Sequence, residues 1–322
     1  MKARAIGDVS EKLIRLNSEL RSSLPNSFYS CHSWFCLFCL PIALVIPTCA
    51  AASEPTPARK LIAAPQVRII AHRGNSCVCP ENTLPAFQSA LDVKADLVEL
   101  DYFHSADGVP VVIHDEILDR TTNAEEVLGQ PKLVVGDLPL SDLRKLDVGI
   151  WFDDKFAGTR LPTLAEALDL IQTRSTTLIE RKAGDAHTLV RLLDTKGLTD
   201  QVVVQSFDWK FVAECRKLSP GLALGALCNK PANPEHIHAA AATGADIIIW
   251  NQEKIGREQI ALIHQLGKKA WAYTIDDPRR AAWLIAAGLD GIITNKPAEM
   301  LQLRSAERGT RSEDNEQASQ QP

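Results

Sequence analysis

Short apolar runs alternate with helical patterns along most of this chain, and this alternation limits the possible folds more than any other feature. The expected strands span 67–71, 97–101, 177–180, 202–206, 222–227, 246–250, 270–274 and 291–294. Because most of these runs are continuously apolar, they are typical of parallel strands covered on both faces. Eight such units that close on themselves make a (β/α)8 TIM barrel, the fold that we predict. A doubly wound open sheet is the second possibility, but no Gly-x-Gly-x-x-Gly follows the first run.

Helix start signals between the runs support this alternation. Thr163 and Glu166 have the spacing of a capping box ahead of an apolar face. Asp277-Pro278 begins a further helical pattern, which we expect to end just before Gly288. These signals favour helices as the crossovers between parallel strands.

One apolar run breaks the alternation. Residues 109–113 follow 97–101 too closely for a parallel crossover, which needs roughly a dozen residues or more. Between them lies Asp107-Gly108, a strong signal for a two-residue hairpin turn. We therefore predict a small β-hairpin insertion after the second strand.

The predicted hairpin also fixes a register. A turn at residues 107–108 pairs Ala106 with Val109, and counting back sets Asp101 opposite His114. Glu99 shares a face with Asp101, because strand side chains alternate with a period of two. We therefore expect Glu99, Asp101 and His114 to converge on one patch.

The N-terminal segment predicts export. Residues 1–33 are polar and basic, 34–46 are mainly apolar, and 50–52 are alanines, an order typical of a secretory signal peptide. We interpret 1–52 as a signal peptide or membrane-targeting segment, which places the protein in the periplasm or outside the cell. Two alternatives stay open: an uncleaved run of borderline length for one membrane anchor, or a lipidated Cys49. Membrane contact would then involve this segment alone.

The rest of the chain divides by composition. Residues 53–66 have the pattern of a Pro-rich linker, and 303–322 are polar, lack aromatic residues and are expected to be disordered. We assign 67–302 to the barrel, because barrels of about 250 residues form single domains.

Charge and cysteine spacing disfavour two classes of function. The net charge is -5, and no basic stripe of the kind that binds nucleic acid is present. The cysteines of the barrel region are Cys77, Cys79, Cys215 and Cys228, with no C-x-x-C pair among them. A structural zinc site is therefore not expected.

Polar residues cluster at the ends of the first three expected strands, which is where barrel enzymes carry their chemistry. Glu99, Asp101 and Glu180 would place three oxygen ligands in one mouth, a set suited to one divalent cation, Ca²⁺ or Mg²⁺. Glu180 and Lys182 are alternatively a simple surface ion pair.

The remaining residues suit phosphoryl chemistry. His72 and His114 are candidates for general acid and general base beside the cation. Arg73 and Lys182 are candidates for binding a phosphoryl oxygen. Glu81 orients a neighbouring histidine or arginine, or else Glu81-Asn82 merely caps the next helix. A cation, two basic groups and an acid/base pair together indicate a phosphoryl-transfer site.

The ordered motifs closely resemble those of the glycerophosphodiester phosphodiesterases. They are A-H-R-G, P-E-N-T, V-E-L-D, D-G-V-P-V-V-I-H-D, L-D-R-T-T-N, L-D-V-G-I-W-F, I-E-R-K, V-V-V-Q-S-F and G-L-D-G-I-I-T-N-K-P. The likeness covers nearly everything from Val67 to about Met300. It implies a metal-dependent barrel enzyme that hydrolyses glycerophosphodiesters, small-molecule substrates, to sn-glycerol 3-phosphate and an alcohol.

The resemblance also implies roles by matching position. His72 and His114 match the acid/base histidines of the family, and Arg73 and Lys182 match its phosphate-contacting cations. Glu81 matches the glutamate of the P-E-N motif, and the three carboxylates named above match the metal ligands.

The chain departs from the family pattern near the seventh strand. Tyr273-Thr274-Ile275-Asp276 stands where the family usually has W-T-V-N. We expect this change to alter the polarity and charge of the pocket rim, and so the preference for substrate. Two other functions remain open: a lysophospholipase D-type phosphodiesterase acting on lysolipids, and a catalytically silent barrel that only binds its ligand.

Overall fold

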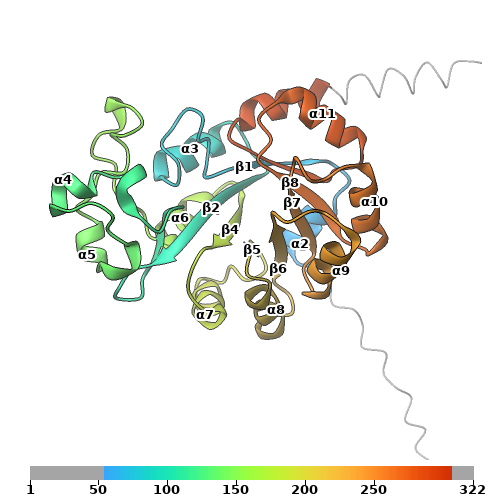
Figure 1. Ribbon diagram of the computed structural model, residues 1–322, viewed down its shortest axis with the longest axis horizontal. Helices are drawn as coiled ribbons and strands as arrows, with labels where there is room; N and C mark the ends of the chain where they lie inside the picture. The colour runs from blue at the N-terminus through green and yellow to red at the C-terminus, as the bar shows by residue number, and fades with distance from the viewer. Residues whose placement is uncertain (1–53, 307–322) are drawn as a thin grey trace, which may run out of the picture. The chain divides into compact units, whose positions relative to one another are not determined.

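Eight parallel strands close into a barrel in the computed structural model, which describes residues 54–306 (Figure 1). They are β1 (Arg68–Ala71), β2 (Leu97–His104), β4 (Thr176–Arg181), β5 (Val203–Ser206), β6 (Ala223–Cys228), β7 (Ile247–Asn251), β8 (Lys269–Tyr273) and β9 (Gly291–Thr294). Strand β1 pairs with both β9 and β2, which closes the ring. The predicted (β/α)8 barrel is therefore confirmed, and the open-sheet alternative is wrong.

Helices connect successive strands and cover the outside of the ring. They are α3 (Leu84–Asp92), α6 (Leu164–Ile171), α7 (Ala186–Lys196), α8 (Trp209–Leu218), α9 (Pro234–Ala242), α10 (Arg257–Gln265) and α11 (Pro278–Ala286). The predicted capping box begins α6, where Thr163 and Glu166 exchange hydrogen bonds. The largest buried cluster joins the apolar faces of these helices to the outward-facing residues of the strands.

The hairpin forms, but its register differs by one residue from the prediction. Strand β3 (Pro110–Val112) runs antiparallel to β2, and Tyr102 pairs with Val112. The Ile113 amide donates to the Asp101 carbonyl at 3.1 Å. The predicted pairing of Asp101 with His114 is therefore wrong, since Ile113 stands opposite Asp101.

The turn explains the shift. The Ser105 amide donates to the Val109 carbonyl at 2.9 Å, so three residues, not two, form the loop. Gly108 closes it in the left-handed region at φ 80°, the arrangement that three-residue hairpin loops prefer. The Ser105 hydroxyl also accepts a hydrogen bond from the Val109 amide, which fixes the longer loop.

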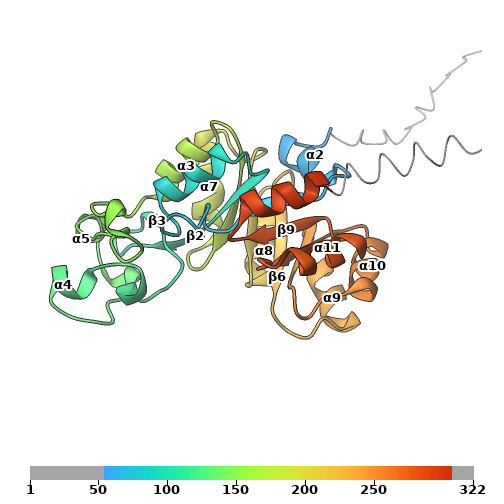
Figure 2. The same ribbon diagram turned by 90° about the horizontal axis from the view of Figure 1, so that it is seen from above.

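The insertion after β2 is larger than the predicted hairpin. Between β3 and α6 lie η2 (Leu118–Arg120), α4 (Ala124–Leu128), η3 (Val135–Asp137), α5 (Leu140–Leu143) and η4 (Asp154–Phe156). These elements have a core of their own, built on residues such as Val111, Leu118, Leu146 and Leu161. In both views α4 and α5 lie at the opposite side of the barrel from α9, α10 and α11 (Figures 1 and 2).

The segment predicted to be a linker contains a helix, α2 (Pro57–Ala63), which closes the N-terminal end of the barrel. Ala58 and Ile62 are buried among the inward-facing residues of the strands. The Ala58 amide donates to the Asp200 carbonyl at 3.1 Å, just before β5, and Arg59 donates to Pro220, just before β6. The linker interpretation of 53–66 is therefore wrong for the helix, because its buried face finds partners only in the folded barrel.

Replacing Ile62 with alanine is expected to lower the free energy of unfolding by about 2–4 kcal/mol, because Ile62 is only 4% exposed and its loss leaves a cavity. Denaturant unfolding of the Ile62→Ala variant measures this change. The matched control is Lys60→Ala on the same helix, whose side chain is 59% exposed. Equal stability of the two variants would contradict the packing of α2 against the barrel.

Only a short part of the predicted C-terminal tail, and none of the predicted signal segment, falls within residues 54–306. The predicted signal segment 1–52 lies outside the described residues. Residues 303–306, predicted to be disordered, continue a helix that begins at 297, and Arg304 donates to the Val67 carbonyl at 2.9 Å. The rest of the predicted tail lies outside the described range. Within 54–306, no helix has the length and apolarity needed to cross a bilayer.

Candidate active site

Three carboxylates converge inside the mouth of the barrel, at the C-terminal ends of the strands. Glu99 and Asp101 lie on the inward face of β2, and Glu180 lies beside Asp101 on β4. One oxygen or more from each lies within 4.8 Å of the others, and all three side chains are buried. The structure thus brings together the three residues predicted to bind a metal ion.

The neighbouring positive side chains do not fully compensate the negative charges of the three carboxylates. Burial, reinforced by the repulsion of Asp101 and Glu180, raises the pKa of Glu99 well above its usual value. Burial and Asp101 raise the pKa of Glu180 to about 7. Burial opposes ionisation of Asp101 as well, but the positive charges of Lys182 and Arg73 outweigh it and lower its pKa to about 2. Three inward hard oxygens with unfavourable mutual repulsion fit a divalent cation, whose charge would allow all three to ionise.

Arg73 is held against the triad by an unusual backbone. Its φ of 54° is left-handed, and its amide donates to Glu99 Oε2 at 2.8 Å. The next residue is Gly74, where a Cβ atom would lie 2.6 Å from the Ala86 backbone, so only glycine fits this close approach to α3. The guanidinium then reaches Asp101 Oδ2 at 3.3 Å.

Lys182 reaches the same carboxylates from the next strand. It follows β4, and its ammonium group lies 3.0 Å from Asp101 Oδ1 and also donates to Glu180. Both predicted cations, Arg73 and Lys182, therefore lie at the triad. The alternative that Glu180 and Lys182 form a simple surface pair is wrong, because Glu180 is buried.

His72 is oriented by Asn295 and Asp276, which follow the neighbouring strands β9 and β8. Its Nδ1 lies 2.7 Å from Asn295 Oδ1, and the Asn295 amide nitrogen donates to Asp276 Oδ2 at 2.7 Å. Burial and the positive charge of Arg73 lower the pKa of His72 to about 4. Asp276 also accepts from the Asn295 backbone amide at 2.8 Å, so its carboxylate holds the loop that positions His72.

His114 belongs to a second hydrogen-bonded chain. Its Nδ1 bonds the Asp115 carboxylate, and Arg120 joins Asp115 to Glu81 with contacts of 2.7 and 2.9 Å to the Glu81 oxygens. Glu81 in turn accepts from Arg73 at 2.8 Å. Burial lowers the pKa of His114, while the charge of Asp101 acts in the opposite direction. Glu81 therefore orients two arginines and ties the second histidine to the triad.

Asn82 has a different role from the predicted helix cap. Its φ is 58°, its amide nitrogen donates to Asp101 Oδ2 at 2.9 Å, and its oxygen accepts from the Asp101 amide at 3.1 Å. Thr83 caps α3 instead. Gln205 on β5 reaches Glu99 at 3.4 Å.

Sequence reasoning missed several supporting residues, namely Asn82 as a partner of Asp101, together with Asp115, Arg120, Gln205 and Asn295. Signals for some of them were present in the motifs P-E-N, H-D and L-D-R. The contact of His72 with Asn295 had no local signal, because 223 positions separate them.

Known proteins with similar sequences include members of one enzyme family. Residues 72–299 match the glycerophosphoryl diester phosphodiesterase family. A glycerophosphodiester phosphodiesterase of Caldanaerobacter subterraneus is 35% identical over 242 residues, covering 73% of this chain and 96% of that protein. One of Bacillus subtilis is 30% identical, covering 74% and 86%.

A solved structure of a phosphodiesterase also resembles this chain. The Oleispira antarctica phosphodiesterase, in complex with its product sn-glycerol-3-phosphate, superposes with a TM-score of 0.66 at 26% identity. The match covers 73% of this chain and 96% of that one.

Proposed function

This chain belongs to the glycerophosphoryl diester phosphodiesterase family, and on that premise we propose that it hydrolyses glycerophosphodiesters to sn-glycerol 3-phosphate and an alcohol in a metal-dependent reaction. The observation that carries the proposal is the buried triad of Glu99, Asp101 and Glu180, with basic groups around it. The product bound to the Oleispira antarctica enzyme supports the same reaction.

The three carboxylates would hold one Ca²⁺ or Mg²⁺ ion. Hard cations of this kind take oxygen ligands, and the triad offers oxygens only. When bound, the ion supplies positive charge to the phosphoryl oxygens and offsets the negative charge that develops there. Arg73 and Lys182 pair with Asp101 of the triad. With the ion balancing the carboxylates, both side chains would be placed to bind the anionic diester.

The two histidines divide the proton transfers. His72 Nδ1 faces an amide oxygen, which accepts its proton and leaves Nε2 as a base for the attacking hydroxyl or water. His114 Nδ1 faces the Asp115 carboxylate, which stabilises the imidazolium. We therefore assign the base to His72 and the acid that protonates the leaving alkoxide to His114. Glu81 keeps Arg73 and Arg120 in position between them.

The proposal predicts a preference between two substrate classes. The intact chain should release glycerol 3-phosphate from glycerophosphocholine with a kcat/KM at least about tenfold above that for choline release from lysophosphatidylcholine, because a deacylated diester places no acyl chain beside the charged groups of the triad. Parallel product assays with both substrates measure the ratio. A reversed ratio would instead assign the enzyme to lysolipids.

A further inference from the structure

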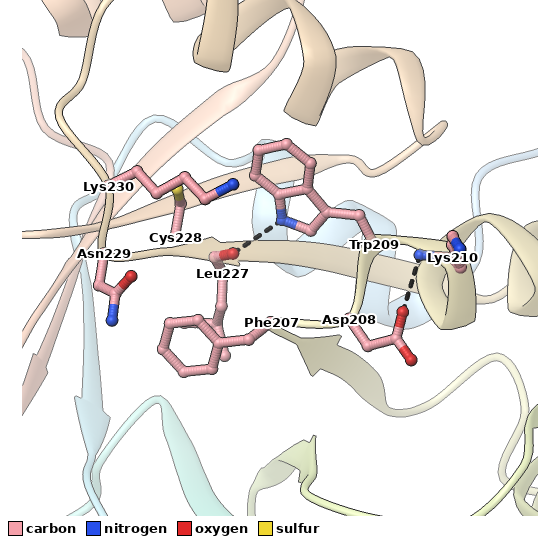
Figure 3. Close-up of a pocket in the computed structure, with 8 residues that line it drawn as sticks. All are labelled: Phe207, Asp208, Trp209, Lys210, Leu227, Cys228, Asn229 and Lys230. Carbon is pink, nitrogen blue, oxygen red and sulfur yellow. Dashed lines mark hydrogen bonds between the residues drawn. The ribbon is translucent and has the colours of Figure 1, made fainter.

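A cavity of about 770 Å³ opens beside the candidate active site, between the C-terminal ends of β5 and β6 and the start of α8 (Figure 3). Its walls combine aromatic and basic side chains: Phe207 and Trp209 follow β5, Lys210 lies in the first turn of α8, and Lys230 follows β6. The volume lies in the range of small-molecule sites. None of these four residues takes part in the chemistry described above.

The cavity adjoins the triad. Gln205, which reaches Glu99, lies two residues before Phe207 on the same chain segment. Tyr273 borders the cavity, because its hydroxyl donates to the Cys228 carbonyl at 3.0 Å and its ring meets the Phe207 ring edge-on at 6.0 Å between centroids. A diester bound at the triad can therefore extend one of its two alcohol groups into this cavity.

The two aromatic side chains of the cavity differ in how firmly they are held. The Trp209 indole donates to the Leu227 carbonyl at 2.8 Å, which holds the ring against the end of β6 (Figure 3). Phe207 is 44% exposed, a high value for a phenylalanine, so its ring is accessible to a ligand. These rings would contact the carbon skeleton of a bound alcohol.

The charge of the cavity is positive. Asp208, which lines the cavity, caps α8 and pairs with Arg181 at 3.2 Å, so its negative charge is compensated. Lys210 and Lys230 are exposed, and neither ammonium group forms a hydrogen bond or ion pair with any of residues 54–306. The ammonium group of Lys254 donates to the Asn229 carbonyl at the same rim.

We propose that this cavity binds the leaving alcohol of the substrate and favours alcohols that carry a second negative group, a phosphate or a carboxylate. The inference rests on the proposed function and adds the class of head group. The aromatic rings alone would suit a quaternary ammonium group by cation–π attraction, but the uncompensated lysines repel it. Lys210 and Lys230 bind the second anionic group while the phosphodiester lies at the triad.

The test compares two diesters that differ in one group: glycerophosphoglycerol, and the same molecule with a terminal phosphate on the leaving glycerol. The parent should favour the phosphorylated diester in kcat/KM. In the double variant Lys210→Met/Lys230→Met the ratio of the two kcat/KM values should fall about tenfold, the size expected for two exposed charge contacts. Added salt should reduce the ratio in the parent as well.

Lys217→Met is the matched control, because Lys217 is an exposed lysine at the C-terminal end of α8, whereas the cavity lies at the start of that helix. It should keep the parental ratio. An unchanged ratio in the double variant, or a parent that prefers glycerophosphocholine to the phosphorylated diester, would overturn this inference while leaving the proposed function intact. A parent that cleaves none of these diesters would instead overturn the proposed function, and the inference with it.

Discussion

Replacing either His72 or His114 with alanine is expected to lower kcat for a glycerophosphodiester by about 100-fold or more, because each variant loses one of the two proton transfers. The effect should fall on kcat more than on KM, since the phosphate-binding groups remain. Steady-state kinetics of both variants with glycerophosphocholine measures this. The two histidines reach the site from different segments, the end of β1 and the start of the insertion, so the variants test two independent placements.

The fold should survive both substitutions. Each histidine is partly exposed at the barrel mouth and contributes little to the apolar core. The control is His238→Ala, an exposed histidine on α9 whose ring forms a hydrogen bond with the Pro234 carbonyl in its own helix. It should retain parental activity. Near-parental turnover in either the His72 or the His114 variant, with the circular dichroism spectrum unchanged, would remove that residue from the acid/base pair.

Replacing Glu180 with glutamine is expected to raise the cation concentration needed for half-maximal activity by about tenfold or more, because one of three charged ligands becomes a neutral amide. Titration of Ca²⁺ or Mg²⁺ into chelator-treated protein, followed by activity, measures the shift. Saturating cation should restore part of the turnover, since Glu99 and Asp101 remain.

Glu235→Gln provides the matched control, because Glu235 is an exposed glutamate on α9 and is not one of the three carboxylates of the triad. Its titration curve should overlay that of the parent. If the Glu180 variant also gave the parental curve, Glu180 would not be a ligand, and its contact with Lys182 would be its main role.

The barrel could be predicted because its signals are local. Most strands are continuous apolar runs, and helix starts are marked by capping residues directly before them, such as Thr163 and Asp277. The triad could be predicted for a related reason: Glu99 and Asp101 share a face by the period of a strand, and parallel neighbours place Glu180 beside them.

Features that depend on distant contacts could not be predicted in the same way. Helix α2 has only seven residues, and its apolar face has no local partner, so its composition favours a linker until the barrel supplies the contacts of Ile62. The hairpin register was decided by the Ser105 side chain and a three-residue loop, where the sequence favours the shorter turn at Asp107-Gly108. Asn295 becomes a partner of His72 only because β9 closes against β1.

The most direct test of the central claim is release of glycerol 3-phosphate from glycerophosphocholine by the intact chain, measured as purified, with EDTA, and after Ca²⁺ or Mg²⁺ is restored. The account predicts release that EDTA abolishes and that at least one of the two cations recovers. Full activity in EDTA would contradict the assignment of the buried triad to a catalytic metal ion, and no release under any condition would contradict the proposed reaction.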